Sequence, residues 1–486
     1  MARKWMTIAI WIVMIALVAA ACSAGNGGGG DAGTKDNGGS GGTTPAGGGG
    51  NSGNSETEPI MFYNGDWPKP QDQNLKQFEE WKKRFEEENP NIKMEAENFS
   101  YDTNTFLPKA ESGQLPNLFS TWFTEPGKII NAGYAADITD IMSKYGYDTA
   151  LNPAMLDLVT KDGRIYGIPS SGYHMGIFYN INIFREAGLL DENGVPVFPR
   201  TYEELAETAK LIKERTGKAG FFFPTKNNQG GWQFMNIAWS YGAEFEQQVD
   251  GKWKAVFNSP EAVEALQFVK DLRWKYDVLP DNVLVDVNDM FRLFGTDQVA
   301  MAYGTSDWWN VPINDYRMSK DNIAISAVPA GPKGRVSLTG GTVYMFSNTS
   351  TPEQVEAGIK WLQIKGFSPE LDPNSLQGLE ESLKSDQELG RVVGPHGMRA
   401  WVNPERVNAE DEIRAKYTNV NMALFEDYMK NEGVTIRPEE PVNAQELYKT
   451  LDAVIQAVLT DENADPKALL DKAVADFQRD YLDKAN

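Results

Sequence analysis

The sequence has few cysteines, histidines and basic residues. One of its 486 residues is cysteine and two are histidine. No disulfide can therefore form within the chain, and the fold must be held by its hydrophobic core. Acidic residues outnumber basic ones by 68 to 46, so the net charge is −22 at pH 7. Nucleic acids are bound through basic surfaces, so this charge argues against nucleic acid as a partner.

Catalytic and cofactor motifs are also missing from the sequence. Residues 59–486 contain no P-loop, no GxGxxG, no GxSxG and no HExxH motif. We therefore predict no cofactor, no metal site and no catalytic residues. The many carboxylates still leave open an acid–base pair of the kind that glycosidases use.

The single cysteine, Cys22, directly follows an apolar run. Arg3 and Lys4 are the only charges before it, and residues 5–21 contain neither a charge nor a proline. This pattern is typical of a secretory signal peptide. The three alanines before Cys22 resemble a bacterial lipobox, in which the cysteine takes a lipid. We predict a signal peptide over residues 1–21 and a lipidated Cys22; the alternative is an ordinary signal peptide with an incidental cysteine.

A glycine-rich segment separates Cys22 from the rest of the chain. Residues 23–58 hold no aromatic, Leu, Ile or Val side chain, so they cannot form a packed core. A flexible linker of this length spans roughly 35 Å. We predict that residues 22–58 are the lipidated cysteine and its tether. The remaining chain exceeds the size at which single cores stop growing, so we expect two domains.

Apolar runs and helical periodicities alternate from residue 60 onward. Residues 60–63 and 92–96 read as strands, and Leu75, Phe78, Trp81 and Phe85 between them recur at helical spacing. A strand, a helix and a second strand form a unit of a parallel sheet. Further strands are predicted at 118–123, 167–178 and 221–223, with helices beginning after Thr201, Ser259 and Thr351. The pattern predicts an α/β fold.

Six segments in order resemble family 1 extracellular solute-binding proteins, the maltose-binding-protein-like receptors of ABC importers. Asn117 and Tyr202 stand where that family usually has Asp and Trp. The segments are SGQLPNLFSTWF (112–123), AGYAADITDI (132–141), GRIYGIPSSGYHMGIFYNINIFREAGL (163–189), PRTYEELAETAKLI (199–212), FGTDQVAMAYGTSDWW (294–309) and VPAGPKGRVSLTGGTVYMFSNTSTPEQVEAGIKWLQ (328–363).

The resemblance implies a two-lobed periplasmic-binding-protein-like fold with a ligand cleft between the lobes and hinge crossovers. By this resemblance the crossings fall near 173–178, 301–304 and 341–346. The expected N-terminal lobe comprises residues 59–173 plus about 305–340. The expected C-terminal lobe comprises residues 178–300 plus about 346–486.

The resemblance also implies the function. We expect a monomeric, non-enzymatic receptor, lipid-anchored at the extracellular face of the membrane of a Gram-positive bacterium. It would bind a carbohydrate, expected to be an oligosaccharide, and deliver it to an ABC permease. The alternatives are a receptor for a peptide or polyamine and an extracellular glycosidase.

Candidate ligand residues follow from the chemistry of sugars, which suit aromatic platforms flanked by carboxylates and amides. Ligand crevices in such sheets lie beyond the carboxyl ends of the strands. Trp67 and Trp122 could equally be core or rim aromatics, and His174 could be a structural histidine. The candidates are Asp66, Trp67, Trp122, Glu125, Tyr173, His174, Trp232, Trp308, Trp309, Gly340 and Gly341.

Overall fold

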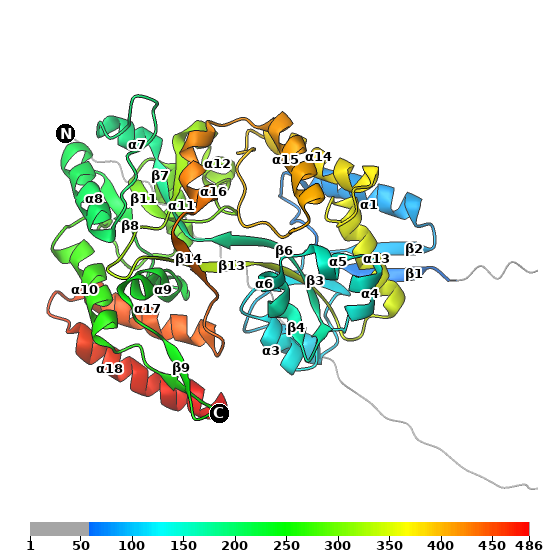
Figure 1. The fold of residues 1–486 in the computed structure, drawn as a ribbon, viewed down its shortest axis with the longest axis horizontal. Helices are drawn as coiled ribbons and strands as arrows, with labels where there is room; N and C mark the ends of the chain where they lie inside the picture. Colours follow the sequence, from blue (N-terminus) through cyan, green and yellow to red (C-terminus); the bar gives the residue numbers. More distant parts are fainter. Residues whose placement is uncertain (1–57, 486) are drawn as a thin grey trace, which may run out of the picture. The chain divides into compact units, whose positions relative to one another are not determined.

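The computed structural model describes residues 58–485. The predicted signal peptide, the lipidation of Cys22 and the tether lie outside the described residues. Within the described part, buried hydrophobic side chains form two large clusters, one for each of two lobes. Figure 1 shows these two groups of elements with strands β6 and β13 running between them.

The N-terminal lobe is built on a sheet whose strand order is β14-β13-β3-β1-β2, with β6 also paired to β13. Its first two strands are parallel, as predicted, and α1 connects them. The strands are β1 (Ile60–Asn64), β2 (Ile92–Ala96), β3 (Leu118–Trp122), β6 (Gly167–His174) and β13 (Arg335–Phe346), beside a small β4 (Thr160–Lys161) and β5 (Arg164–Ile165) hairpin. β14 (Val434–Arg437) pairs with the other end of β13, where Val434 packs against the C-terminal cluster. The helices are α1 (Leu75–Glu88), α2 (Phe106–Glu111), α3 (Pro126–Asn131), α4 (Thr139–Lys144), α5 (Tyr147–Ala150), α6 (Pro153–Leu156) and α13 (Pro352–Ile364).

The C-terminal lobe is built on a four-stranded sheet of order β12-β7-β11-β8. Its strands are β7 (Gly176–Asn180), β8 (Ala219–Phe222), β11 (Val299–Gly304) and β12 (Ile323–Ala327), beside a β9 (Glu246–Val249) and β10 (Lys252–Ala255) hairpin. Its helices are α7 (Ile181–Glu186), α8 (Tyr202–Thr216), α9 (Gln229–Tyr241), α10 (Pro260–Trp274), α11 (Val287–Gly295), α12 (Val311–Tyr316), α16 (Glu426–Lys430), α17 (Ala444–Thr460), α18 (Pro466–Phe477) and the short α19 (Asp483–Ala485). A third, small cluster joins α14 (Pro373–Glu388) to α15 (Pro404–Tyr417).

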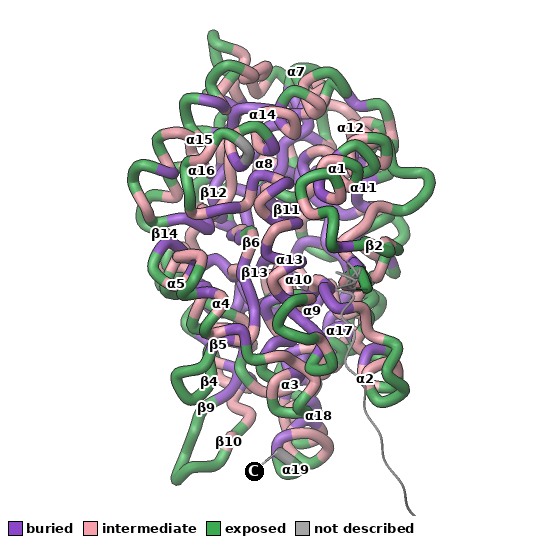
Figure 2. The backbone as a smooth tube through the Cα atoms, turned by 90° about the vertical axis from the view of Figure 1, so that its right-hand side faces the viewer, coloured by how far each residue is buried: buried purple, intermediate pink, exposed green. Residues whose placement is uncertain are grey.

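Two long stretches of strand pass from one lobe to the other. β6 pairs with β13 in the sheet of the N-terminal lobe, and β7 begins two residues after β6 in the other sheet. On β13, Leu338 packs into the C-terminal cluster, whereas Val343 and Met345 pack into the N-terminal one. Figure 2 shows both stretches as largely buried along their length. Strands β6 and β13 therefore form the walls of the space between the two hydrophobic clusters.

The structure corrects the predicted assignment of two segments to the lobes. Residues 323–327 form β12, which pairs with β7 in the C-terminal lobe and not the N-terminal one. Helix α13 instead packs its Trp361 against Phe85 and Trp67 of the N-terminal lobe. The predicted crossing near 301–304 is also wrong, because β11 and the segment after it stay in the C-terminal lobe. Pairing partners far away in the chain decide both assignments.

Local capping explains where several helices begin. The Thr351 hydroxyl accepts a hydrogen bond from the backbone amide of Gln354, and the Gln354 side-chain oxygen accepts one from the backbone amide of Thr351. This capping box satisfies two amide donors that the first turn of a helix leaves free. Ser259 caps α10 through the Ala262 amide, and Thr201 caps α8. These three helix starts were predicted from the sequence and are confirmed.

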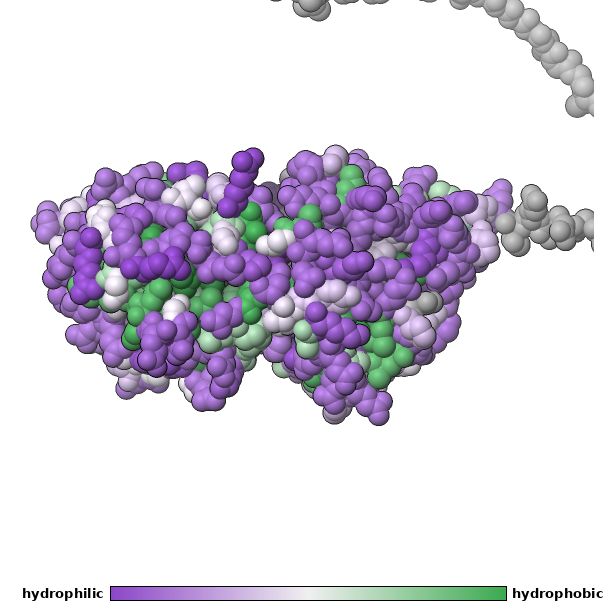
Figure 3. All heavy atoms as spheres, turned by 90° about the horizontal axis from the view of Figure 1, so that it is seen from above, coloured by the Kyte–Doolittle hydropathy of each residue, from purple (hydrophilic) through white to green (hydrophobic). Residues whose placement is uncertain are grey.

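The visible surface of the described part is mostly hydrophilic, with smaller apolar patches between the polar groups (Figure 3). None of the helices between residues 58 and 485 is both long and apolar enough to cross a membrane. Over the same residues, no group of three or more His, Cys, Asp or Glu side chains is placed to hold a metal ion.

Candidate functional site

A cavity of about 330 Å³ lies where the two lobes meet along β6 and β13. Its walls come from the end of β3, from β6 and β13, from the start of α9, from the turn after β11 and from the segment that leads into α17. Its lining residues are Trp122, Phe123, Thr124, Tyr173, Asn227, Asn228, Gln229, Trp232, Asp307, Trp308, Gly340, Gly341, Thr342, Glu439, Gln445 and Tyr448. We call this space the inner cavity.

Aromatic rings dominate the inner cavity. The Trp232 ring centroid lies 6.4 Å from that of Tyr173, with the planes at 85°. It lies 5.5 Å from that of Trp308. Trp122 faces them from β3 and is 46% exposed, a large value for a tryptophan at the end of a central strand. Its ring meets the edge of Tyr101, 5.3 Å away, which steadies its orientation. Apolar sugar faces could stack on such rings.

Two glycines let the strands approach the aromatic rings closely. A Cβ at Gly340 would lie 2.3 Å from the Tyr173 hydroxyl oxygen. One at Gly341 would lie 2.1 Å from the Ser171 carbonyl oxygen and 2.5 Å from the Phe123 ring. Neither distance is possible for a real side chain, so both positions require glycine unless neighbouring groups move.

Substitution of Gly340 by alanine is expected to weaken ligand binding about tenfold, because the new methyl group would push Tyr173 out of its place in the inner cavity. A tenfold loss corresponds to about 1.4 kcal/mol. Isothermal titration of both proteins would measure it. Gly127→Ala is the matched control, because its Cβ would meet no atom within 4 Å. Equal affinity of the Gly340 variant and the wild type would show that Tyr173 does not contribute to binding.

Two carboxyl groups face the aromatic rings. Asp307 follows β11, accepts a hydrogen bond from Thr305 and remains exposed toward the cavity. Burial among protein atoms raises its pKa above the ordinary range. Glu439 accepts a hydrogen bond of 3.0 Å from the Tyr448 hydroxyl. Burial raises the pKa of Glu439 to about 8, and the nearby Glu125 carboxylate adds to the shift. Both groups can accept hydrogen bonds from sugar hydroxyls.

The turn before α9 is held from the far side by a buried aspartate. Asp452 of α17 accepts hydrogen bonds of 2.8 Å from the amides of Asn228 and Gly231. Asn227 and Asn228 both have positive φ angles, of 61° and 69°, which asparagine tolerates better than most residues. The Asn228 side chain donates to Gln445, 3.1 Å away. These bonds hold the turn whose Asn227 and Asn228 line the cavity, at the start of the helix that carries Trp232.

A second space of about 780 Å³ adjoins the inner cavity, and we call it the outer cavity. The two spaces share Trp122, Asn227, Asn228 and Gln445. The outer cavity also has Asp102, Thr103, Asn104, Lys226, Glu446, Lys449, Asp452, Ala453, Gln456 and Tyr481 along its walls. Together the two spaces give room for a chain of sugars and not only for one ring.

Of the predicted ligand residues, six line the inner cavity: Trp122, Tyr173, Trp232, Trp308, Gly340 and Gly341. The structure places the other five elsewhere. Asp66 pairs with Lys365 at 2.5 Å and accepts a hydrogen bond from the Trp361 indole. Trp67 packs on Phe78 and Trp361. Both belong to the core of the N-terminal lobe, because α13 covers the end of β1.

The remaining three residues support the cavity without lining it. Glu125 is buried and accepts a hydrogen bond from Tyr101, the residue that contacts Trp122. His174 is buried, stacks on Tyr428 at 4.1 Å and bonds to its carbonyl oxygen, so it is a structural histidine. Trp309 is 7% exposed and packs against Phe425. The adjacent tryptophans 308 and 309 therefore point in different directions.

Several lining residues were missed by the reasoning from sequence. Asp307 directly precedes Trp308, so its position beside a candidate tryptophan was the available signal. Glu439, Gln445 and Tyr448 come from a part of the chain where no motif was found. They reach the cavity because β14 pairs with β13 and directs the following segment back to it.

A pair of buried glutamates lies just behind Glu439. Glu246 is 6% exposed, and burial raises its pKa to about 8, with the Glu440 carboxyl adding to the shift. Burial likewise raises the pKa of Glu440 to about 7, although Arg437 opposes this. The folded state thus binds protons that the unfolded chain, with an ordinary glutamate pKa of 4.5, releases earlier.

This pair predicts a loss of stability on the alkaline side. The stabilisation is complete below about pH 4.5 and is lost as the pH rises through about 8. The glutamine of the Glu246→Gln variant cannot ionise. Between pH 5 and pH 9 the unfolding free energy of the wild type should therefore fall by at least about 1.4 kcal/mol more than that of the variant. Urea unfolding at the two pH values measures the difference. Equal losses in both proteins would mean that Glu246 is already ionised in the fold.

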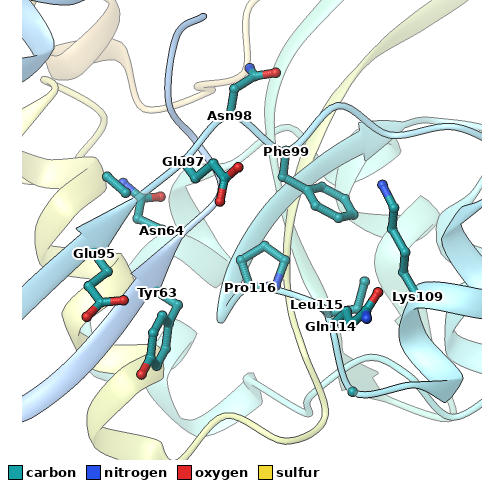
Figure 4. A pocket seen from close by; sticks show the side chains of 12 residues that line it. Tyr63, Asn64, Glu95, Glu97, Asn98, Phe99, Lys109, Gln114, Leu115 and Pro116 are labelled. Carbon is teal, nitrogen blue, oxygen red and sulfur yellow. The ribbon is translucent and has the colours of Figure 1, made fainter. Parts of the chain in front are cut away.

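A separate hollow of about 570 Å³ lies on the N-terminal lobe alone. Figure 4 shows Tyr63 and Glu95, from β1 and β2, at one end and Lys109 at the other. The Lys109 ammonium sits 5.1 Å from the centre of the Phe99 ring. None of the predicted ligand residues lines this hollow, and it has no wall from the C-terminal lobe. The inner cavity is therefore the better candidate site.

Comparison with known proteins places the chain in a family. A family model described as bacterial extracellular solute-binding protein matches residues 69–364, more than half of the chain. The chain belongs to this family. The resemblance seen in the sequence is thereby confirmed. Members of this family are binding proteins.

Two solved structures of other binding proteins share the fold of this solute-binding protein. One is a solute-binding protein of Thermotoga lettingae bound to α-D-tagatose, with a TM-score of 0.66 and 19% identity, covering 87% of this chain and 99% of that one. The other is maltose-bound MalE3 of T. maritima, with a TM-score of 0.62, 20% identity and coverages of 87% and 99%. These matches confirm the predicted two-lobed α/β fold.

A curated relative is the arabinooligosaccharide-binding protein of Halalkalibacterium halodurans. It is 24% identical over 326 residues, which are 65% of this chain and 66% of the relative.

Proposed function

We propose that this solute-binding protein is a lipid-anchored extracellular receptor that binds a neutral oligosaccharide in the inner and outer cavities. It would deliver that ligand to the permease of an ABC importer. The observation that carries the proposal is the group of four aromatic side chains, Trp122, Tyr173, Trp232 and Trp308, gathered from both lobes around one cavity. The sugar names of the relative and of the bound structures support it.

The inner cavity would hold the first sugar rings by stacking and hydrogen bonding. Trp122 and Trp232 offer ring faces, whereas Asp307, Glu439 and Asn228 offer polar groups for hydroxyls. The outer cavity would receive the rest of the chain, since it shares Trp122 and the Asn227–Asn228 turn with the inner one. Closure of the lobes about β6 and β13 would then cover the sugar.

Thermal unfolding in the presence of candidate ligands tests the proposal. The panel comprises arabinotriose, xylotriose, maltotriose, short peptides and spermidine. A ligand at 100 times its Kd stabilises by about 2.7 kcal/mol, which raises the Tm by a few degrees for a chain of this size. A shift with one class of trisaccharide is expected. A shift with peptides or spermidine alone, or hydrolysis of the trisaccharide, would contradict the proposed function.

Delivery and anchoring need a separate test in cells. Radiolabelled palmitate should label the wild-type chain and not a Cys22→Ser variant. Deletion of the gene should abolish uptake of the trisaccharide found in the unfolding assay. Normal uptake without the gene would contradict the proposed delivery to a permease but would not contradict the proposed binding of sugar.

A further inference from the structure

The inner cavity contains charge of one sign only. Asp307 and Glu439 line it, and Glu125 lies close enough to raise the pKa of Glu439. Among the described residues that line this cavity, none is lysine, arginine or histidine. No ion pair is found for Asp307 or Glu439 among the described residues, so no cation balances either carboxyl group inside the cavity.

The two carboxyl groups act on the same space. Burial raises the pKa of Tyr173 well above its ordinary value, and Asp307 and then Glu439 are the charges that add to this shift. Both carboxyl groups therefore interact electrostatically with the Tyr173 hydroxyl. Tyr173 lines the cavity beside Gly340 and Trp232. A ligand ring that contacts Tyr173 is thus within electrostatic reach of both groups.

Two lysines line the outer cavity. They are Lys226, from the loop after β8, and Lys449, on α17. Three carboxylates line it as well, of which Asp452 is bound to the backbone amides of the turn before α9. The outer cavity therefore has cations near its acidic groups, whereas the inner cavity has acidic groups alone.

We propose that Asp307 and Glu439 are specificity-determining residues that exclude acidic sugars from the inner cavity. Once ionised, carboxylates without a cationic partner in a partly desolvated site repel a third carboxylate strongly, because water screens the charges less there than in bulk. The inner cavity then accepts neutral or amine-bearing units and rejects uronic or aldonic acids. This inference rests on the proposed function, since it concerns the ligand class of the same site.

A charge series built on one sugar tests the inference. Maltose, xylobiose and arabinobiose are each converted at the reducing end into a neutral alditol, an anionic aldonate and a cationic aminoalditol. The three products share an open-chain end and differ mainly in charge. Disaccharides are short enough for the charged end to stay near the inner cavity. Calorimetry with the full-length chain in detergent at pH 9, above the pKa of Glu439 near 8, gives the affinities.

The wild type is expected to bind each aldonate at least tenfold more weakly than the matching alditol. It should bind each aminoalditol at least as tightly as the matching alditol. In the double variant Asp307→Asn, Glu439→Gln the ratio of aldonate to alditol affinity should shrink to within threefold, whatever its affinity for the alditol. Glu87→Gln removes one charge from the exposed face of α1, away from both cavities, and is the matched control, in which the tenfold ratio should persist.

Repeating the titrations of the wild type at high salt concentration is a second test, and it needs no variant. At 1 M NaCl the Debye length falls to about 3 Å, so the ratio in the wild type should narrow. Equal binding of alditol and aldonate by the wild type would overturn the inference while leaving sugar binding in place. So would a ratio unchanged by both the double variant and salt. Failure of every parent disaccharide and of the trisaccharide panel to bind would overturn the proposed function, and the inference with it.

Discussion

Replacing Trp308 with alanine is expected to weaken oligosaccharide binding about 30-fold and to leave the fold stable. Trp308 lies between Trp232 and Phe291, with centroid distances of 5.5 and 5.3 Å, and lines the inner cavity. Large aromatic side chains at the centre of a binding site commonly contribute 2 kcal/mol or more, and about 2 kcal/mol corresponds to 30-fold. Calorimetric titration with the trisaccharide that binds the wild type measures the change.

Its neighbour Trp309 is the matched control, because the same substitution one residue later should act on stability. Trp309 is buried against Phe425 and Tyr428, and Trp→Ala changes in cores cost about 3–5 kcal/mol. Denaturant unfolding would report that loss. If Trp308→Ala instead destabilised the protein and left the affinity unchanged, Trp308 would be a core residue and the site would lie elsewhere.

Removal of the Lys365 side chain is expected to destabilise the N-terminal lobe by about 3–5 kcal/mol, because it leaves the buried Asp66 carboxylate without its cation. The two side chains are 14% and 15% exposed and their charged atoms are 2.5 Å apart. Asp66 also accepts hydrogen bonds from Trp361 and Tyr344, so it cannot turn away. Urea unfolding of Lys365→Ala against the wild type measures the loss.

Lys83→Ala provides the control for this measurement. Lys83 pairs with Glu87 on the exposed face of α1, where its side chain is 78% exposed, and such pairs contribute less than about 1 kcal/mol. Ligand affinity should stay unchanged in Lys365→Ala, because neither Asp66 nor Lys365 lines the cavity. A variant with normal stability and lost binding would return Asp66 to the ligand site that the sequence suggested.

Much of the fold followed from local signals in the chain. The parallel pairing of β1 and β2 and the caps at Thr201, Ser259 and Thr351 depend on residues close in sequence. The assignment of segments to lobes did not follow, because it depends on which distant strand each segment pairs with. β12 packs in the C-terminal lobe through its pairing with β7, and α13 packs in the N-terminal lobe against β1.

The candidate site shows the same division. The aromatic and glycine residues were predicted from the ends of strands and from their order in the family pattern. Asp66 and His174 share that position and chemistry, but long-range partners, Lys365 and Tyr428, bury them in the fold. Glu439 was invisible for the converse reason, since the pairing of β14 with β13 brings it to the cavity from nearly a hundred residues away.

The most direct test of the account is a calorimetric titration of the best-binding trisaccharide into the wild type and into Trp122→Ala. Trp122 is the most exposed aromatic ring of the inner cavity and belongs to both cavities. The account predicts one site per chain in the wild type and at least tenfold weaker binding in the variant. Unchanged affinity in Trp122→Ala and also in Trp308→Ala would contradict it and would move the search to the hollow on the N-terminal lobe.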